Sequence, residues 1–268
     1  MKTILTLFAL VVPVFCFAGK DAEKLRAQVR CPFAKVSKLW ENRFEWDVSK
    51  SIEKNVEEFV EIDLKPFVET IESLEENGDR PIDGIALEAP GNIYAKNLDT
   101  FSEFFRRVLV TINEESVSQL YGLEPDENGI FWDDGWQFTY ESHRLFIITT
   151  APFYGIHNSR FNYGIKSAVI LFQPEGSFKH HLSREPNKRN RQRENARRNF
   201  EKHGQTYSTS KSMLTDSEGK AHEAPRYIKP LNLEDEPVRW WIKKPGSSIS
   251  RKKQQREDDD LKSMCSVQ

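Results

Sequence analysis

The 268-residue sequence is poor in cysteine, with three in all, and it lacks the motifs that mark several common enzyme classes. It contains no G-x-S-x-G, H-E-x-x-H, P-loop or G-x-G-x-x-G pattern, which argues against hydrolases, zinc proteases and nucleotide-binding proteins built on those motifs. No Cys-x-x-Cys pair is present, so a structural zinc site is not expected. Its basic residues come without a recognised nucleic-acid-binding module, and we therefore expect no nucleic-acid partner.

Long apolar runs are also scarce, and the one at the N-terminus is short. Lys2 precedes an apolar run from Ile4 to Phe17, and Ala18 supplies a small residue at its end. This pattern predicts a signal peptide over residues 1–18 and a secreted or secretory-pathway protein. An uncleaved signal anchor is the alternative, although the run is short for a membrane span. After cleavage we expect no integral membrane span.

The charge of the chain is unevenly distributed, although its formal net charge is only −2. Acidic residues dominate from Glu41 to Asp79, and basic residues dominate from Arg184 to His203. Such runs are usually solvated helix faces, and a basic patch for an anionic partner is the alternative. From Gly246 the sequence is polar and charged, and we expect residues 246–268 to form a disordered tail.

The spacing of apolar residues predicts one α+β domain over residues 19–245. Helical spacing is found in the segments Lys20–Arg30, Ser51–Glu76, Phe101–Asn113 and Arg184–His203. Short apolar runs bounded by turn residues predict the strands Ile82–Ala89, Trp136–Tyr140, Leu145–Thr150 and Lys166–Phe172. We therefore expect a mainly antiparallel sheet of about four strands, flanked by helices.

Two local signals refine the predicted helices. Pro66 should kink the helix over Ser51–Glu76, or split it near Leu64, because proline lacks the N–H that continues a helix. Thr100 and Glu103 have the spacing of a capping box at the start of the next helix.

The loop Ala151–Tyr163 separates two of the predicted strands and carries the candidate functional side chains. Loops held by a rigid sheet often form binding sites. His157 can bind heme iron or another metal, or move protons. The alternative is a structural role, in which its side chain caps a backbone group. Arg160 can hold a carboxylate or a propionate, or form a structural salt bridge. Tyr154 places a phenol beside them.

Cys31 lies within the predicted domain, whereas Cys16 belongs to the predicted signal peptide and Cys265 to the predicted tail. Cys31 precedes Pro32, so it lies in an extended or turn segment. A buried, inert thiol is the simplest interpretation, and a thiolate ligand or nucleophile is the alternative. An oxidising compartment would also allow a disulfide between Cys31 and Cys265.

Six segments follow one another in a characteristic order. They are Cys31-Pro32-Phe33-Ala34, the aromatic strand pair from Trp136 to Pro152, Ser159-Arg160-Phe161, Leu171-Phe172-Gln173-Pro174 with Phe178, the basic stretch Arg189–Arg198, and Glu223-Ala224-Pro225-Arg226-Tyr227. In this order they resemble the YqcI/YcgG family, over most of the chain from about Cys31 to Tyr227.

The resemblance implies a heme-dependent oxygenase that N-hydroxylates a small guanidino or amino compound, since the relatives include heme-dependent guanidino N-hydroxylases. Heme would lie between the sheet and the basic helix. His157, or less favourably Cys31, would bind the iron. Arg160 and Arg197 would pair with propionates or with a substrate carboxylate. Tyr154 would line the pocket, and the heme would supply the oxidative chemistry.

The sequence departs from that family in two respects. Ala151-Pro152 stands where some relatives carry His-Pro, and a signal peptide is predicted although those relatives are cytoplasmic. The alternative function is that of a secreted, non-enzymatic binding or effector protein on the same scaffold, because a fold does not determine a function.

Overall fold

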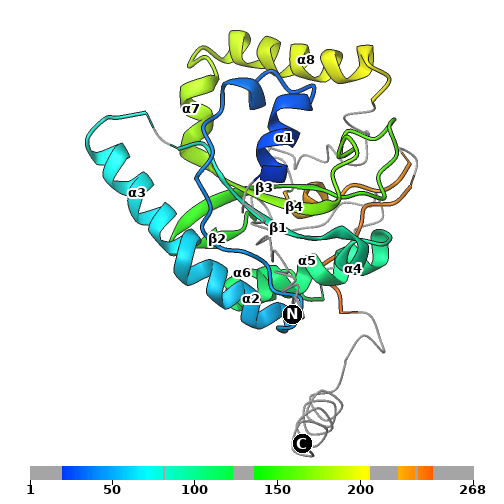
Figure 1. Ribbon diagram of the computed structural model, residues 1–268. Helices are drawn as coiled ribbons and strands as arrows, with labels where there is room; N and C mark the ends of the chain where they lie inside the picture. Colours follow the sequence, from blue (N-terminus) through cyan, green and yellow to red (C-terminus); the bar gives the residue numbers. More distant parts are fainter. Residues whose placement is uncertain (1–19, 81, 123–135, 206–222, 233–234, 244–268) are drawn as a thin grey trace, which may run out of the picture.

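The computed structural model describes residues 20–80, 82–122, 136–205, 223–232 and 235–243 (Figure 1). Its helical elements are α1 (Lys20–Gln28), η1 (Ala34–Val36), α2 (Ile52–Phe59), η2 (Val60–Leu64), α3 (Lys65–Glu76), α4 (Gly91–Tyr94), α5 (Leu98–Ile112), α6 (Glu114–Ser118), η3 (Glu175–Ser177), α7 (Phe178–His181), α8 (Pro186–Lys202) and α9 (Ala224–Tyr227). Its strands are β1 (Ile85–Pro90), β2 (Thr139–Tyr140), β3 (His143–Thr150) and β4 (Ser167–Pro174). The predicted signal peptide, the predicted charged tail and Cys265 lie outside the described residues.

The strands form one antiparallel sheet in the order β1-β4-β3-β2 (Figure 1). Glu141 and Ser142 have φ angles of 45° and 69° and make the two-residue turn between β2 and β3. This left-handed geometry matches the twist of a hairpin. The register runs from Leu145↔Pro174 to Thr150↔Val169 between β3 and β4, and from Ile85↔Phe172 to Pro90↔Ser167 between β1 and β4. The predicted α+β class with a mainly antiparallel sheet is confirmed.

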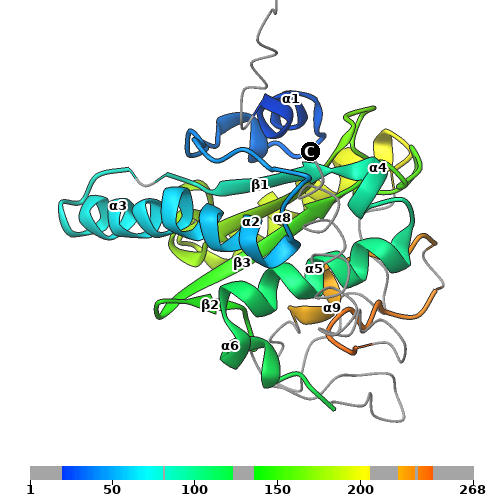
Figure 2. The same cartoon turned by 60° about the horizontal axis from the view of Figure 1, so that its bottom comes forward.

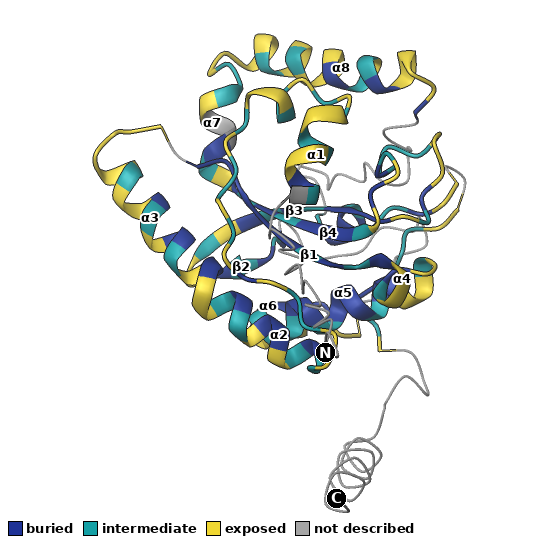
Figure 3. Ribbon diagram, viewed as in Figure 1, coloured by how far each residue is buried: buried dark blue, intermediate teal, exposed yellow. Residues whose placement is uncertain are grey.

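Helices cover both faces of the sheet (Figure 1, Figure 2). α2, α3, α5 and α6 lie on one side and α1, α7 and α8 on the other. The main core lies on the first side and contains the buried rings of Phe59, Phe105 and Phe172. The strands are largely buried, whereas much of α8 is exposed (Figure 3). None of the helices in the described ranges has both the length and the apolar character that a membrane span requires.

The long helix predicted over Ser51–Glu76 forms, and it changes its winding just before the proline. Residues Val60–Leu64 make a π-helical turn between α2 and α3, and Pro66 lies in the first turn of α3. Proline has no N–H to donate, and the wider turn ahead of it accommodates the interrupted bonding pattern. Where the sequence predicted a kink or a split near Leu64, the helical run continues without a gap and changes only its winding.

The π-helical turn places a carboxylate, Asp63, inside the core. The Asp63 side chain is fully buried. Its Oδ1 accepts a hydrogen bond from Trp40 Nε1 at 3.1 Å. Its Oδ2 accepts from the backbone N–H groups of Arg43 and Phe44 at 2.9 and 2.7 Å. Asp63 thus fastens the segment before α2 to the helix, and both of its oxygens are satisfied, as burial requires.

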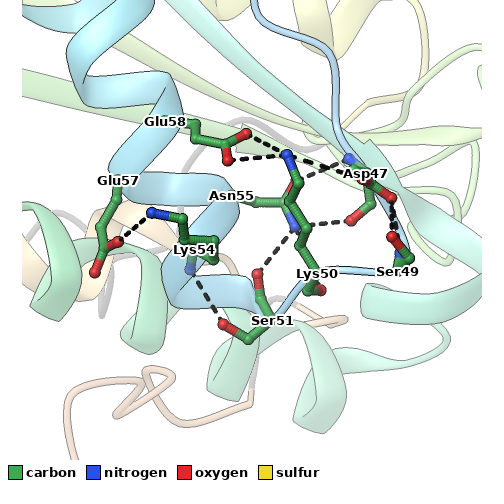
Figure 4. A network of polar contacts seen from close by, with 8 residues as sticks. All are labelled: Asp47, Ser49, Lys50, Ser51, Lys54, Asn55, Glu57 and Glu58. Carbon is green, nitrogen blue, oxygen red and sulfur yellow. Dashed lines mark hydrogen bonds and ion pairs between the residues drawn. The ribbon is translucent and has the colours of Figure 1, made fainter. Parts of the chain in front are cut away.

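A polar network fixes the start of α2 (Figure 4). Ser51 is the N-cap, and its hydroxyl accepts from the backbone N–H of Lys54 at 3.1 Å. The buried Asn55 side chain donates through Nδ2 to the carbonyls of Asp47 and Ser51 at 2.8 and 2.9 Å. Asn55 Oδ1 accepts from the Asp47 N–H at 2.8 Å. These bonds satisfy backbone groups that the helix leaves without partners.

α5 begins earlier than the sequence predicts. Asn97 is its N-cap and forms the capping box with Thr100, whose hydroxyl accepts from the Asn97 N–H at 3.2 Å. The predicted box between Thr100 and Glu103 is therefore wrong. Asn is at least as good an N-cap as Thr, and here the asparagine side chain reaches the N–H of Thr100. Glu103 pairs instead with Arg106, with an Nη2–Oε1 distance of 2.7 Å.

The segment around α9 completes the core beside β3. β2 has only two residues, fewer than the predicted strand Trp136–Tyr140. The backbone N–H of Phe138 donates instead to the hydroxyl of Tyr227 at 3.1 Å. The Tyr227 carbonyl accepts from the hydroxyl of Thr149 at 2.5 Å. Trp240 packs against Tyr227 in the same place, so this irregular region is an integral part of the core.

Candidate functional site

The central loop, Ala151–Tyr163, is held in place by the chain that follows α9. The hydroxyl of the buried Tyr154 donates to the carbonyl of Lys229 at 2.7 Å. Asn158 Nδ2 donates to the carbonyl of Pro230 at 3.0 Å. These two bonds join residues that are 75 and 72 positions apart in the sequence. The loop is therefore a positioned surface on which side chains from both segments meet.

Charged side chains meet where the loop contacts α9. Arg160 Nη2 donates to the carbonyl of Arg226 at 3.0 Å. Arg226 Nη1 pairs with Glu223 Oε1 at 2.8 Å, and its guanidinium carbon lies 5.9 Å from the ring centre of Phe146. Glu223 is mostly buried, and its second oxygen, Oε2, has no hydrogen-bond partner among the described residues. Such an unsatisfied buried oxygen is uncommon in a purely structural ion pair.

α8 contributes further positive charge to this place. Burial, the neighbouring arginines of α8 and Arg226 all lower the pKa of Arg193, and Glu223 opposes them. Arg193 therefore lies close to the residues of α9. We use the name basic cluster for Arg160, Arg193, Arg226 and Lys229. The last three act on the carboxylate of Glu223, and Arg160 donates to the Arg226 carbonyl beside it.

The pKa values within the basic cluster report its electrostatics. Burial, followed by the charges of Arg160 and Arg226, lowers the pKa of Lys229 to about 7, although Glu223 acts in the opposite direction. Burial raises the pKa of Glu223, and the cations around it oppose that rise. Both effects have the sign expected where desolvation is strong. Strongly perturbed groups of this kind are enriched at functional sites.

The five residues that the sequence nominates lie in or beside this region, with different surroundings. The exposed His157 makes a hydrogen bond from Nδ1 to the carbonyl of Gly204, at 3.1 Å, just after α8. Burial raises the pKa of Tyr154, and Arg160 acts against that rise. Arg197, on α8, is among the charges that lower the pKa of Arg193.

Cys31 lies beside the same region as a free thiol. Burial raises its pKa, while the charge of Arg160 and hydrogen bonds with the backbone of Phe33 and Ala34 lower it less strongly. Its thiol form is therefore favoured over the thiolate that would bind a metal or attack a substrate. The possible disulfide with Cys265 involves a residue outside the described ranges.

Heme does not fit the arrangement of the described residues. His157 is exposed, and the thiolate of Cys31 is disfavoured. Neither His157 nor Cys31 lines either of two surface cavities of about 540 Å³ in the described part of the chain. The described ranges also contain no group of three His, Cys, Asp or Glu side chains that could hold a metal ion. We assign no reaction step to heme, which stays a prediction of the resemblance.

Sequence reasoning missed the roles of Glu223, Arg226 and Lys229. The first two were recognised as part of a motif, but nothing in their spacing shows that they face Arg160 and α8. Asp63 was missed as well, although the sequence contains a signal for it. It stands seven residues after Val56 and four before Phe67, on the apolar face of a helix where an acid must be buried.

Comparisons with known proteins leave the relationship of this chain open. No family model, no curated protein and no solved structure matches it. The resemblance to the YqcI/YcgG family thus stays a prediction from the order of short motifs. The function must be inferred from the chemistry of the site itself.

Proposed function

We propose that the protein binds a small anionic molecule, carrying carboxylate or phosphate groups, at the basic cluster. The observation that carries this proposal is the convergence of Arg193, Arg226 and Lys229 on the single carboxylate of Glu223, with Arg160 bound to the Arg226 carbonyl beside them. The central loop, α8 and the α9 segment each contribute at least one of them. The proposal corresponds to the binding-protein alternative, and the predicted signal peptide supports a secreted location.

The electrostatics of the basic cluster favour an added anion. Burial lowers the pKa of Lys229 to about 7, and repulsion by the charges of Arg160 and Arg226 contributes to the same shift. An anion would remove this repulsion and gain charge-assisted hydrogen bonds. Arginine suits the role because its planar guanidinium can donate two parallel bonds to a carboxylate or phosphate. Glu223 acts as an internal substitute for such an anion, paired through only one of its oxygens.

Heme-dependent N-hydroxylation is a separate prediction, drawn from the YqcI/YcgG resemblance alone. The proposed anion site does not depend on it. A small-molecule substrate remains the expected partner if the protein proves to be an enzyme.

Calorimetric titration of the full chain with citrate and with inorganic phosphate tests the proposal. Arg193→Gln should weaken binding about fivefold, the scale of one partly exposed ion pair. Arg198→Gln is the matched control, because Arg198 lies on the same helix and pairs with Glu194 at 3.2 Å. Glu223→Gln should strengthen binding, because the substitution removes the internal carboxylate that competes with the ligand.

Two results would contradict the proposal. One is the absence of saturable binding of either anion to the wild-type chain at low ionic strength. The other is an equal loss of affinity in Arg193→Gln and Arg198→Gln, which would show a diffuse effect of surface charge. Circular dichroism of each variant confirms that the fold is intact before affinities are compared.

A further inference from the structure

A surface cavity lies where α4 and the segment after it meet the start of the central loop. It has a volume of about 540 Å³. Its lining comes from α4 and the segment just after it, from the loop residues Pro152 and Phe153, and from Lys166, which precedes β4. None of the basic-cluster residues lines it. Its size is within the range of cavities that bind small organic molecules.

The floor of this cavity is apolar and firmly packed. Phe153 lies edge-on against Phe101 of α5, with ring centres 5.8 Å apart. Gly91 N–H donates to the carbonyl of Lys166 at 3.1 Å. A Cβ atom at Gly91 would lie 2.4 Å from that carbonyl oxygen and 2.5 Å from Pro152 Cγ. Only glycine permits this close approach, so the three segments that form the floor are held together at one point.

The rim of the cavity carries two positive charges. Lys96 and Lys166 are both exposed and line it. Neither ammonium group forms an ion pair or hydrogen bond with a described residue. Asn92, also exposed, adds an amide to the same rim. An apolar floor beneath two uncompensated cations is complementary to an amphipathic anion.

We infer that this cavity binds a small molecule with an apolar body and one carboxylate group. The body lies on Pro152 and Phe153, and the carboxylate lies between Lys96 and Lys166. A fully polar anion such as phosphate would gain nothing from the apolar floor, and a neutral apolar molecule would leave both ammonium groups without a partner. This site is separate from the basic cluster and does not rest on the function proposed for it.

Calorimetric titration of the full chain with 4-phenylbutyrate tests the inference, with 4-phenylbutanamide as the uncharged probe. The acid should bind, and the amide should bind at least about tenfold more weakly. The double variant Lys96→Gln/Lys166→Gln should lose at least about tenfold in affinity for the acid. Lys35→Gln/Lys65→Gln is the matched control, since it removes two exposed lysines elsewhere and should leave the affinity unchanged. Asn92→Trp should abolish binding because the indole fills the cavity.

The outcomes separate this site from the basic cluster. Unchanged binding of 4-phenylbutyrate in Arg193→Gln shows that the cavity binds independently of the basic cluster, whichever way the citrate titration turns out. The inference is overturned if the wild-type chain does not bind the acid, if acid and amide bind equally, or if the double lysine variant and its control behave alike. An Asn92→Trp variant that is folded by circular dichroism and still binds with full affinity would also overturn it.

Discussion

Two buried carboxylates in this protein have opposite surroundings. Asp63, in the π-helical turn, accepts hydrogen bonds on both oxygens from Trp40 and from backbone N–H groups. Glu223, at α9, is paired through one oxygen, has no hydrogen bond on the other, and lies among several cations. Both are mostly or fully buried, so burial alone does not distinguish their roles.

The difference lies in how completely each carboxylate is satisfied. A buried group with all its bonds made contributes to stability and leaves nothing for a ligand to replace. Around Glu223 several cations share one carboxylate, and the excess positive charge that remains favours an added anion. We therefore assign a structural role to Asp63 and a place in a binding site to Glu223.

The largest effect is expected at Asp63. Asp63→Asn would place an NH₂ group against backbone N–H donors, and we expect a loss of about 3 kcal/mol in the free energy of unfolding. Urea unfolding followed by circular dichroism measures it. Asp79→Asn, at an exposed position, is the control and should change stability little. A loss below about 1 kcal/mol for Asp63→Asn would mean that the hydrogen bonds of the Asp63 carboxylate contribute little to stability, and the structural role assigned to it would be wrong.

An intermediate effect, dependent on pH, is expected at Lys229. Its pKa is lowered from an ordinary 10.5 to about 7 in the folded protein. Between these values the unfolded chain holds more protons than the folded one, so stability rises as pH increases from about 7 to 10.5. Below pH 7 the charged lysine opposes folding to its full extent.

Thermal unfolding across this pH range, compared with Lys229→Met, measures that contribution. The variant cannot titrate at this position, so the wild type should gain stability relative to it as pH rises. The exposed Lys35→Met is the control and should follow the wild type. If stability changes with pH in the same way for the wild type and for Lys229→Met, the pKa of Lys229 is not lowered in the folded protein.

Local sequence patterns predicted the fold well because they act over short distances. Short apolar runs bounded by turn residues located β3 and β4, and Pro66 located the change in winding between α2 and α3. The errors were also local. The sequence predicted Thr100 as the N-cap of α5, and the structure uses Asn97, three residues earlier. The segment from Trp136 is shorter as a strand because Tyr227 takes over one of its hydrogen bonds.

The candidate site could be predicted only in part, because its contacts join distant parts of the chain. Arg160 and Tyr154 could be nominated from their loop, since polar groups on a short loop between strands are a local signal. Their partners Arg226 and Lys229 lie 66 and 75 residues further along the chain. No spacing rule links residues so far apart, and the identity of Glu223 as the central carboxylate depends entirely on that packing.

The smallest change in stability is expected at His157, and it also gives a test of the heme prediction. His157 is exposed, and it is hydrogen-bonded to the Gly204 carbonyl at 3.1 Å, so His157→Ala should cost about 1 kcal/mol or less. The geometry predicts no other consequence, whereas the YqcI/YcgG resemblance predicts a Soret absorbance band that this substitution removes or shifts. A spectrum of the wild type and the variant after heme supplementation separates the two. A band that depends on His157 would show that the functional site is at the exposed loop rather than at the buried charges around Glu223. A colourless wild type would contradict the heme prediction, and the contrast between Asp63 and Glu223 would then point to the functional site.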